Sequence, residues 1–279
     1  MKTLGYYNGK FDEIEKMQIP MLDRVCSFGD GVYDVTYARN HKIFTLEEHM
    51  DRFFASAEQL DIRLPHDKEG MKYLLQEMVN LCDDGNLVIC WQATRGTQVR
   101  SHAYPYDMIA NIWITIRPCD IVDMTEKVDL ITVEDTRYLH CNIKTLNLIP
   151  NVMASQRALK EGVHEALFHR GERVTECAHS NVHIIKDGVL LTPPADCYIL
   201  KGVARDNLIK ACQNLNIPVN IRPFTVQEIF NADEVIITSS GSLCLQVGKV
   251  DGIEVGGKAE DIIKKLQAYL LDEFLKATE

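Results

Sequence analysis

The segment HCNIKTLNLIPNV, residues 140–152, contains one lysine, Lys144, between a strand-like stretch and a helix-like stretch. The preceding residues, VDLITVEDTRYL, are rich in β-branched and apolar side chains, which favour a strand. The following residues, PNVMASQRALKEG, have Pro150 near the start of a predicted helix and Gly162 just past its end. Lys144 is therefore expected at a strand-to-helix turn, where functional side chains are common. It is either a surface charge on a packed stem or an amine kept for chemistry.

The composition is that of an ordinary globular protein, with 279 residues, 46% of them hydrophobic and 25% charged. A net charge of -10 argues against nucleic acid as a partner. The N-terminus has no apolar core of the kind found in signal peptides, and no apolar run is long enough to span a membrane. Nine cysteines without a C-x-x-C pair indicate reduced thiols. We therefore expect a cytoplasmic protein without membrane or nucleic-acid partners.

Strand and helix patterns alternate in the first part of the chain. Apolar residues recur at helical intervals in TLEEHMDRFFASAEQL, where Thr45 and Glu48 have the spacing of a capping box. A second amphipathic helix is predicted in DKEGMKYLLQEMVNLC, and strands are predicted in LVICWQATRG and MIANIWITIRP. The two strands are joined by RGTQVRSHAYPYD, residues 95–107, which we call the R-x-H loop. Long loops in compact domains are often functional.

The apolar pattern breaks at residues 118–127, which marks the best candidate for a domain boundary. We expect a smaller N-terminal α/β domain over residues 1–120 and a larger C-terminal domain over residues 121–279. Strands and helices intermingle in both, so the fold class is α/β (α+β) with mixed sheets. In the second domain the pair Asp187 and Gly188 predicts a hairpin turn.

Several common site signatures are absent. The chain has no G-x-G-x-x-G and no Walker loop, so it lacks the usual marks of a dinucleotide or P-loop site. The string HEALFH places its histidines five residues apart in a predicted strand, where they point to opposite faces. We expect no metal site.

Four features together suggest one chemistry. Lys144, Glu176 and Arg52 are each, taken alone, more typical of a protein surface than of a site, and the hydroxyl-rich TSSGS at residues 238–242 is as typical of a polar turn as of a phosphate site. Together they are what a pyridoxal phosphate site requires. The lysine binds the cofactor covalently, the carboxylate keeps the pyridine nitrogen protonated, and the arginine with the hydroxyl turn holds the phosphate.

Seven strings occur along the chain in one order: SFGDGVYDV, FTLEEHMDRFFASAE, TRGTQVRSHAYP, CNIKTLNLI, RVTECAHSNVHIIKDGVLLTPP, ILKGVARDNLI and DEVIITSSGS. In this order and with these intervals the chain resembles the class IV (fold type IV) pyridoxal-phosphate aminotransferases over nearly its whole length, from about residue 4 to 270. Within that family it is most similar to enzymes that act on D-amino acids. The resemblance implies two domains with the cofactor site between them.

The resemblance implies roles for single residues. Lys144 would bind pyridoxal 5′-phosphate and move the proton, Glu176 would pair with the ring nitrogen, and Arg52 would hold the phosphate. The remaining cofactor contacts would come from the backbone amides of Val203 and Ala204, the hydroxyls of Ser239 and Ser240, and the side chain of Leu200. Helix N-termini prefer anions, which suits the first pair.

The resemblance also implies a substrate site. Tyr33, together with Arg100 and His102 on the R-x-H loop of a neighbouring subunit, would bind the substrate α-carboxylate, so a homodimer is expected. An arginine suits planar carboxylates. The chain departs from the family pattern at Tyr37, His179, Ala204 and Gly241, which leaves the acceptor range of the side-chain pocket open.

The function expected from the resemblance is transfer of an amino group from a D-amino acid, such as D-alanine, to a 2-oxo acid, 2-oxoglutarate or pyruvate. Three other activities occur on the same scaffold: a branched-chain L-amino acid aminotransferase, an aminodeoxychorismate lyase and an (R)-selective amine transaminase. A binding protein without catalysis is the alternative outside this class.

Overall fold

The computed structural model describes residues 1–279 and divides into two compact units. The first unit contains Met1–Asp120, Ile143–Asn147 and Leu275–Glu279, and the second contains Ile121–Asn142 and Leu148–Phe274. Both combine helices with sheets, so the predicted α+β class is confirmed, and the sheet of the second unit is mixed. Each predicted domain was one continuous segment, whereas each unit contains more than one segment of the chain.

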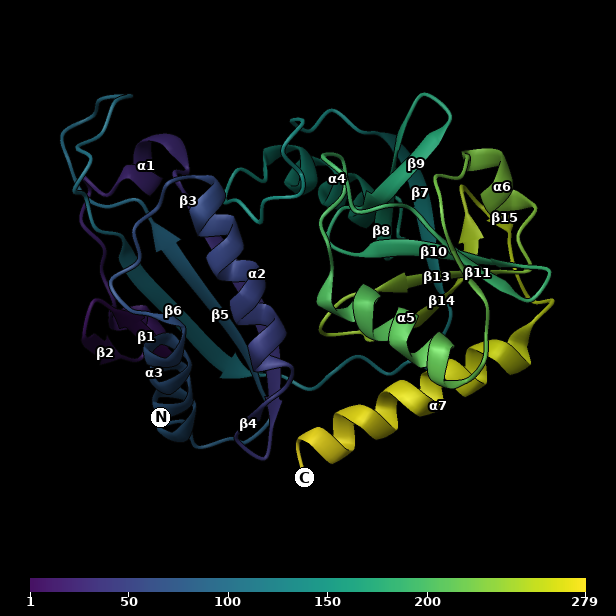
Figure 1. The fold of residues 1–279 in the computed structure, drawn as a ribbon, viewed down its shortest axis with the longest axis horizontal. Helices are drawn as coiled ribbons and strands as arrows, with labels where there is room; N and C mark the ends of the chain where they lie inside the picture. Colours follow the sequence, from purple (N-terminus) through teal and green to yellow (C-terminus); the bar gives the residue numbers. More distant parts are fainter. The chain divides into compact units, whose positions relative to one another are not determined.

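The first unit is built on one antiparallel sheet with helices packed on it (Figure 1). The strand order is β2-β1-β6-β5-β3-β4, and α2 packs against β3 while α3 packs against β6 and α2. The strands are β1 (Leu4–Tyr7), β2 (Lys10–Asp12), β3 (Gly31–Arg39), β4 (Lys42–Ile43), β5 (Leu87–Thr94) and β6 (Asn111–Pro118). The helices are the 3-10 turn η1 (Ile14–Lys16), α1 (Arg24–Phe28), α2 (Leu46–Gln59) and α3 (Lys68–Asn80).

Helix α2 confirms the helix predicted from its apolar spacing, but its predicted capping box is wrong. Met50, Phe53 and Ala57 are buried on the face toward the sheet. Thr45 has a left-handed backbone, with φ 47°, and its side chain caps no backbone amide. The chain enters α2 directly from the short hairpin that ends in β4, and Thr45 there lacks the extended backbone that a capping threonine normally adopts.

The second unit is built on a nine-stranded mixed sheet. Its order is β12-β11-β10-β13-β14-β7-β8-β9, with β15 beside β14, and the pairs β11–β12, β14–β7 and β7–β8 are parallel. The strands are β7 (Val128–Glu134), β8 (Glu165–Arg170), β9 (Arg173–Cys177), β10 (Asn181–Lys186), β11 (Val189–Thr192), β12 (Val219–Ile221), β13 (Glu234–Thr238), β14 (Leu245–Val250) and β15 (Ile253–Glu254). The helices are α4 (Ile149–Lys160), α5 (Val203–Asn214), α6 (Val226–Phe230) and α7 (Glu260–Ala277), whose end, from Leu275, belongs to the first unit.

The connection that contains Lys144 differs in part from the prediction. Strand β7 ends at Glu134, and residues 135–148 have no regular structure before α4 begins at Ile149. The strand predicted in VDLITVEDTRYL therefore ends earlier than expected, although Lys144 does lie in a strand-to-helix connection. The hairpin at Asp187 and Gly188 is confirmed, with positive φ at both residues.

Three further features bear on function. All nine cysteines are free, and four of them are buried. No cluster of histidine, cysteine or acidic residues is arranged to hold a metal ion. No helix is both long and apolar enough to cross a bilayer.

Candidate active site

The backbone of the lysine segment pairs with the open edge of β3. Strand β4 pairs only with the far end of β3, which leaves its edge uncovered near Tyr33. Tyr33 N donates to Lys144 O at 3.0 Å, and Leu146 N donates to Gly31 O at 3.0 Å. Unpaired strand edges bind extended segments in this way. The pairing explains why residues 143–147 belong to the first unit.

The Lys144 side chain is half-buried and faces an aromatic ring. Its Nζ lies 4.2 Å from the centroid of the Tyr33 ring, within the distance at which an amino group contacts a ring face. Lys144 N donates to Ser56 Oγ at 3.2 Å, and Ser56 lies one turn after Arg52 on α2. Three residues predicted for the site, Tyr33, Arg52 and Lys144, are thus gathered in the first unit.

Arg52 is held by a buried carboxylate. Its Nε donates to Asp34 Oδ2 at 2.9 Å and its Nη2 to Asp34 Oδ1 at 2.6 Å. Asp34 is fully buried on β3 and also contacts His49 Nδ1 at 2.7 Å. Burial alone would raise the pKa of Asp34, but Arg52 and His49 hold it well below its usual range. Burial lowers the pKa of His49. The bidentate pair fixes the direction of the guanidinium.

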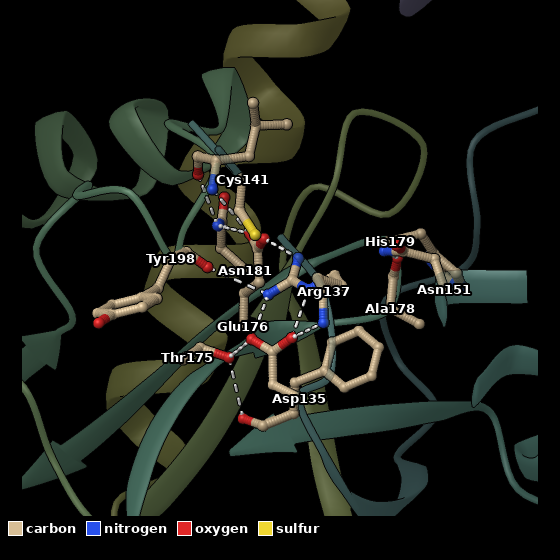
Figure 2. Close-up of polar contacts among 12 residues, drawn as sticks. Asp135, Arg137, Cys141, Asn151, Thr175, Glu176, Ala178, His179, Asn181 and Tyr198 are labelled. Carbon is tan, nitrogen blue, oxygen red and sulfur yellow. Dashed lines mark hydrogen bonds and ion pairs between the residues drawn. The ribbon is translucent and has the colours of Figure 1, made fainter. Parts of the chain in front are cut away.

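Glu176 lies in the second unit and accepts three hydrogen bonds (Figure 2). Arg137 Nη1 donates to Oε1 at 2.5 Å, while Asn181 Nδ2 and Leu200 N donate to Oε2 at 3.0 and 3.1 Å. The side chain is 7% exposed. Three N–H donors on a buried carboxyl suit its ionised form. This anion is suited to hold a proton on a ring nitrogen.

Arg137 is itself fixed by a second buried acid. Its Nε and Nη2 donate to Asp135 at 2.9 Å each, and Nη2 also donates to Tyr198 O at 3.1 Å (Figure 2). Asp135 in turn accepts from Thr175 Oγ1 at 3.0 Å. This network orients the arginine that contacts Glu176, and sequence reasoning missed both Asp135 and Arg137.

The start of α5 is suited to an anion. Gly202 at the N-cap has no side chain to accept from the first amides, and the amides of Val203 and Ala204 have no partners within the helix. A Cβ on Gly202 would collide with Asn181 Oδ1. Only glycine allows this close approach, and the first amides of α5 therefore have no side-chain cap.

Asn181 links the start of α5 to the other residues predicted in the second unit. Its Nδ2 donates both to Glu176 and to Leu200 O, the latter at 2.9 Å. In the β10–β13 pair it lies opposite Thr238, the residue before Ser239. The Ser239 hydroxyl hydrogen-bonds Ser242 Oγ at 2.7 Å. A carboxylate, a helix start and a hydroxyl turn therefore surround one asparagine, and this set of groups fits a phosphate-bearing pyridine.

The R-x-H loop forms a third group, in the first unit. Arg100 and His102 are both exposed and both contact Phe28: the Arg100 Cζ lies 5.1 Å and the His102 ring 5.2 Å from its centroid. No hydrogen bond or ion pair joins the pair to Lys144 or Tyr33. Sequence reasoning thus named residues that fall into three groups. It missed Asp34, although an acid on the buried face of an alternating strand needs a partner.

Glu165, the acid of the HEALFH string, holds the turn between Glu176 and Asn181. It is fully buried and accepts from His179 N at 2.5 Å, Ser180 N at 3.0 Å and Ser180 Oγ at 2.8 Å. Burial outweighs these donors and raises the pKa of Glu165 to about 7. Glu165 therefore has a structural role in this turn. His179, one of the departures from the family pattern, contacts Glu165 through its backbone amide.

We expect Glu165→Gln to flatten the pH dependence of stability. Because the folded pKa is raised from 4.5 to about 7, stability from the protonated acid is complete below 4.5 and is lost as the pH rises through 7. The shift corresponds to about 3 kcal/mol. Urea unfolding at pH 5, 6, 7 and 8 measures it, with the exposed Glu172→Gln as control. If the free energy of unfolding changes with pH by the same amount in wild type and in Glu165→Gln, the prediction is wrong.

Comparison with known proteins identifies the class. The sequence profile of the family described as Amino-transferase class IV matches residues 31–250. The chain belongs to this family and is a transaminase, which confirms the resemblance inferred from its motifs. Among its relatives is the D-alanine aminotransferase of Listeria monocytogenes serotype 4b (strain F2365), 39% identical over 99% of this chain and 97% of the relative. The D-alanine aminotransferase of Staphylococcus haemolyticus is 37% identical over 95% of each chain.

Solved structures share the fold. The branched-chain amino acid aminotransferase from Escherichia coli superimposes with a TM-score of 0.90 at 21% identity, covering 100% of this chain and 96% of that one. The branched-chain aminotransferase from the thermophilic archaeon Thermoproteus uzoniensis, solved with norvaline, has a TM-score of 0.87 at 22% identity, covering 98% and 96%. These likenesses establish the fold type IV architecture and no substrate.

Proposed function

We propose that the protein transfers the amino group of a D-amino acid to a 2-oxo acid, with pyridoxal 5′-phosphate as its cofactor. The observation that carries this proposal is the position of the Lys144 amine beside the Tyr33 ring. Tyr33 lies on β3, and Asp34, the next residue of that strand, orients Arg52. The D-alanine aminotransferases that match nearly the whole chain support D-amino acids as substrates.

Each residue predicted to contact the cofactor would supply one part of its chemistry. Lys144 and Arg52 would supply the covalent attachment and a phosphate contact. Glu176 would face the ring nitrogen. The remaining contacts would come from Leu200, the amides of Val203 and Ala204, and the hydroxyls of Ser239 and Ser240. When bound, the cofactor supplies an electron sink and carries the amino group between the two half-reactions.

The chain's own residues would do the remaining work. The Lys144 amine would take the proton from the substrate α-carbon and return it, as a positioned general base and acid. Tyr33, Arg100 and His102 would hold the α-carboxylate and so set which face of the substrate meets Lys144. We further propose a homodimer in which the R-x-H loop serves the neighbouring active site, which agrees with the absence of bonds from this loop to Lys144.

A paired assay tests the substrate class. With 2-oxoglutarate as acceptor, we expect 2-oxo acid to form from D-alanine at least about 100-fold faster than from L-alanine or L-leucine. L-alanine is the matched control because only the configuration changes. A preference for L-leucine would instead assign the branched-chain activity. Pyruvate released from aminodeoxychorismate without an acceptor would assign the lyase.

A further inference from the structure

Arg24, the first residue of α1, is buried, with its side chain 5% exposed. We propose that Arg24 is a positioning residue that holds the R-x-H loop in the shape in which Arg100 and His102 bind the substrate carboxylate. This inference rests on the proposed function, because it assigns a purpose to the loop's geometry through that substrate.

The Arg24 guanidinium binds the backbone of Ser101, which lies between Arg100 and His102, and the backbone of His102. Its Nη1 donates to Ser101 O at 2.6 Å and its Nη2 to His102 O at 3.2 Å. Its Nε donates to Asp30 Oδ2 at 2.7 Å. The planar guanidinium thus donates from Nη1 and Nη2 to two consecutive carbonyls, while its Nε is fixed by the Asp30 carboxylate. Ser101 separates Arg100 from His102, so this contact controls how both side chains leave the loop.

The same short helix gives both substrate-binding side chains a common surface. Phe28 follows Arg24 by four residues on α1, so the two lie on one face. The Arg24 Cζ lies 4.8 Å from the Phe28 centroid, and Arg100 and His102 contact the same ring. Helix α1 therefore contacts both the backbone and the side chains of the R-x-H loop.

That element is anchored in the sheet. Asp23, fully buried at the N-cap of α1, accepts from Thr94 Oγ1 at 3.0 Å and Asn111 Nδ2 at 2.9 Å. Arg24 N donates to Gly96 O at 2.9 Å. The two strands that border the R-x-H loop, β5 and β6, thus fix the helix that in turn holds the loop.

Asp30 connects the anchor to the strand of Tyr33. It also accepts from Arg95 Nε at 2.9 Å, and it directly precedes β3. The Arg24–Asp30 pair therefore fixes the loop to the start of β3 within the first unit. Because Arg95 stays with Asp30, loss of Arg24 leaves no unpaired buried carboxylate, and the variants below are expected to fold.

We expect Arg24→Lys, which keeps the charge but loses the fork, to raise KM for D-alanine roughly 10- to 100-fold with little change in kcat. Arg24→Gln should do the same. Trypsin cleavage after Arg100 should accelerate at least about fivefold, because a released loop is a better protease substrate. The visible absorbance of the bound cofactor should be unchanged, since the Lys144 contacts are not touched.

Arg63→Gln is the matched control. Arg63 contacts the far end of the same loop, donating to Tyr106 O at 3.4 Å, but it contacts neither Arg100 nor His102. We expect its KM and its cleavage rate after Arg100 to stay within about twofold of wild type.

Arg100→Gln separates the two proposals. If Arg100→Gln raises KM while both Arg24 variants leave KM and cleavage at wild-type values, Arg24 has no positioning role. If Arg100→Gln leaves KM for D-alanine unchanged, the loop does not bind the carboxylate and that part of the proposed function fails. Wild-type cleavage in the Arg24 variants overturns the positioning role whatever Arg100→Gln does.

Discussion

Lys144→Ala is expected to lose turnover by at least about 10³-fold, because general acid–base catalysis alone contributes roughly 10²–10⁴-fold and the covalent attachment is lost as well. The structure gives the physical reason. The Lys144 amine lies 4.2 Å from the Tyr33 centroid, and its backbone is fixed by bonds to Tyr33 and Ser56. Alanine keeps those backbone bonds, so the variant should fold normally and lose only the amine.

Covalent trapping tests this role directly. Borohydride treatment of the wild-type holoenzyme, followed by digestion and mass spectrometry, should place the cofactor on the peptide that contains Lys144. Lys144→Ala should retain none, and added methylamine should restore part of the turnover. Lys72→Ala, which removes a half-buried lysine of α3 that pairs with Glu47, should behave as wild type. Cofactor trapped on another lysine, or turnover that survives in Lys144→Ala, would refute the assignment.

Local sequence patterns were sufficient to predict those elements whose buried residues recur at regular intervals or whose turn residues have a characteristic type. Helix α2 follows from apolar spacing, and the hairpin at Asp187 and Gly188 follows from residues that tolerate positive φ. The capping box failed because Thr45 and Glu48 have the right spacing but the chain's entry from β4 gives Thr45 a left-handed backbone. Propensity describes a residue and its neighbours, whereas that entry is set by a hairpin.

Long-range contacts account for what could not be predicted. Lys144 joins the first unit because β3 leaves an edge open more than a hundred residues earlier in the chain. The residues that orient the predicted site, such as Asp34 for Arg52 and Arg137 for Glu176, carry no local motif. The residues of the site were suggested by their combined chemistry and by the family resemblance. The residues that orient them are far away in the sequence and are recognised only from the folded structure.

Glu176→Gln is expected to lower kcat on the order of 10²–10³-fold, comparable to the loss of one preorganised electrostatic contact. A neutral amide cannot hold a proton on a ring nitrogen as a carboxylate does. The surroundings add a second penalty. Arg137 donates to one oxygen, and Asn181 and Leu200 donate to the other. A glutamine must therefore turn its NH₂ group toward a donor on one side.

Two matched variants decide whether the charge or the structure matters. Glu176→Asp keeps the anion and should retain more kcat than Glu176→Gln, even though its shorter side chain meets Arg137 less well. Glu172→Gln, an exposed change just before β9, should leave kcat and the visible spectrum of the cofactor at wild-type values. For Glu176→Gln the spectrum should change while cofactor remains bound, because the protonation of the ring changes. Equal kcat for Glu176→Gln and wild type would show that Glu176 is not needed to keep the ring nitrogen of the cofactor protonated.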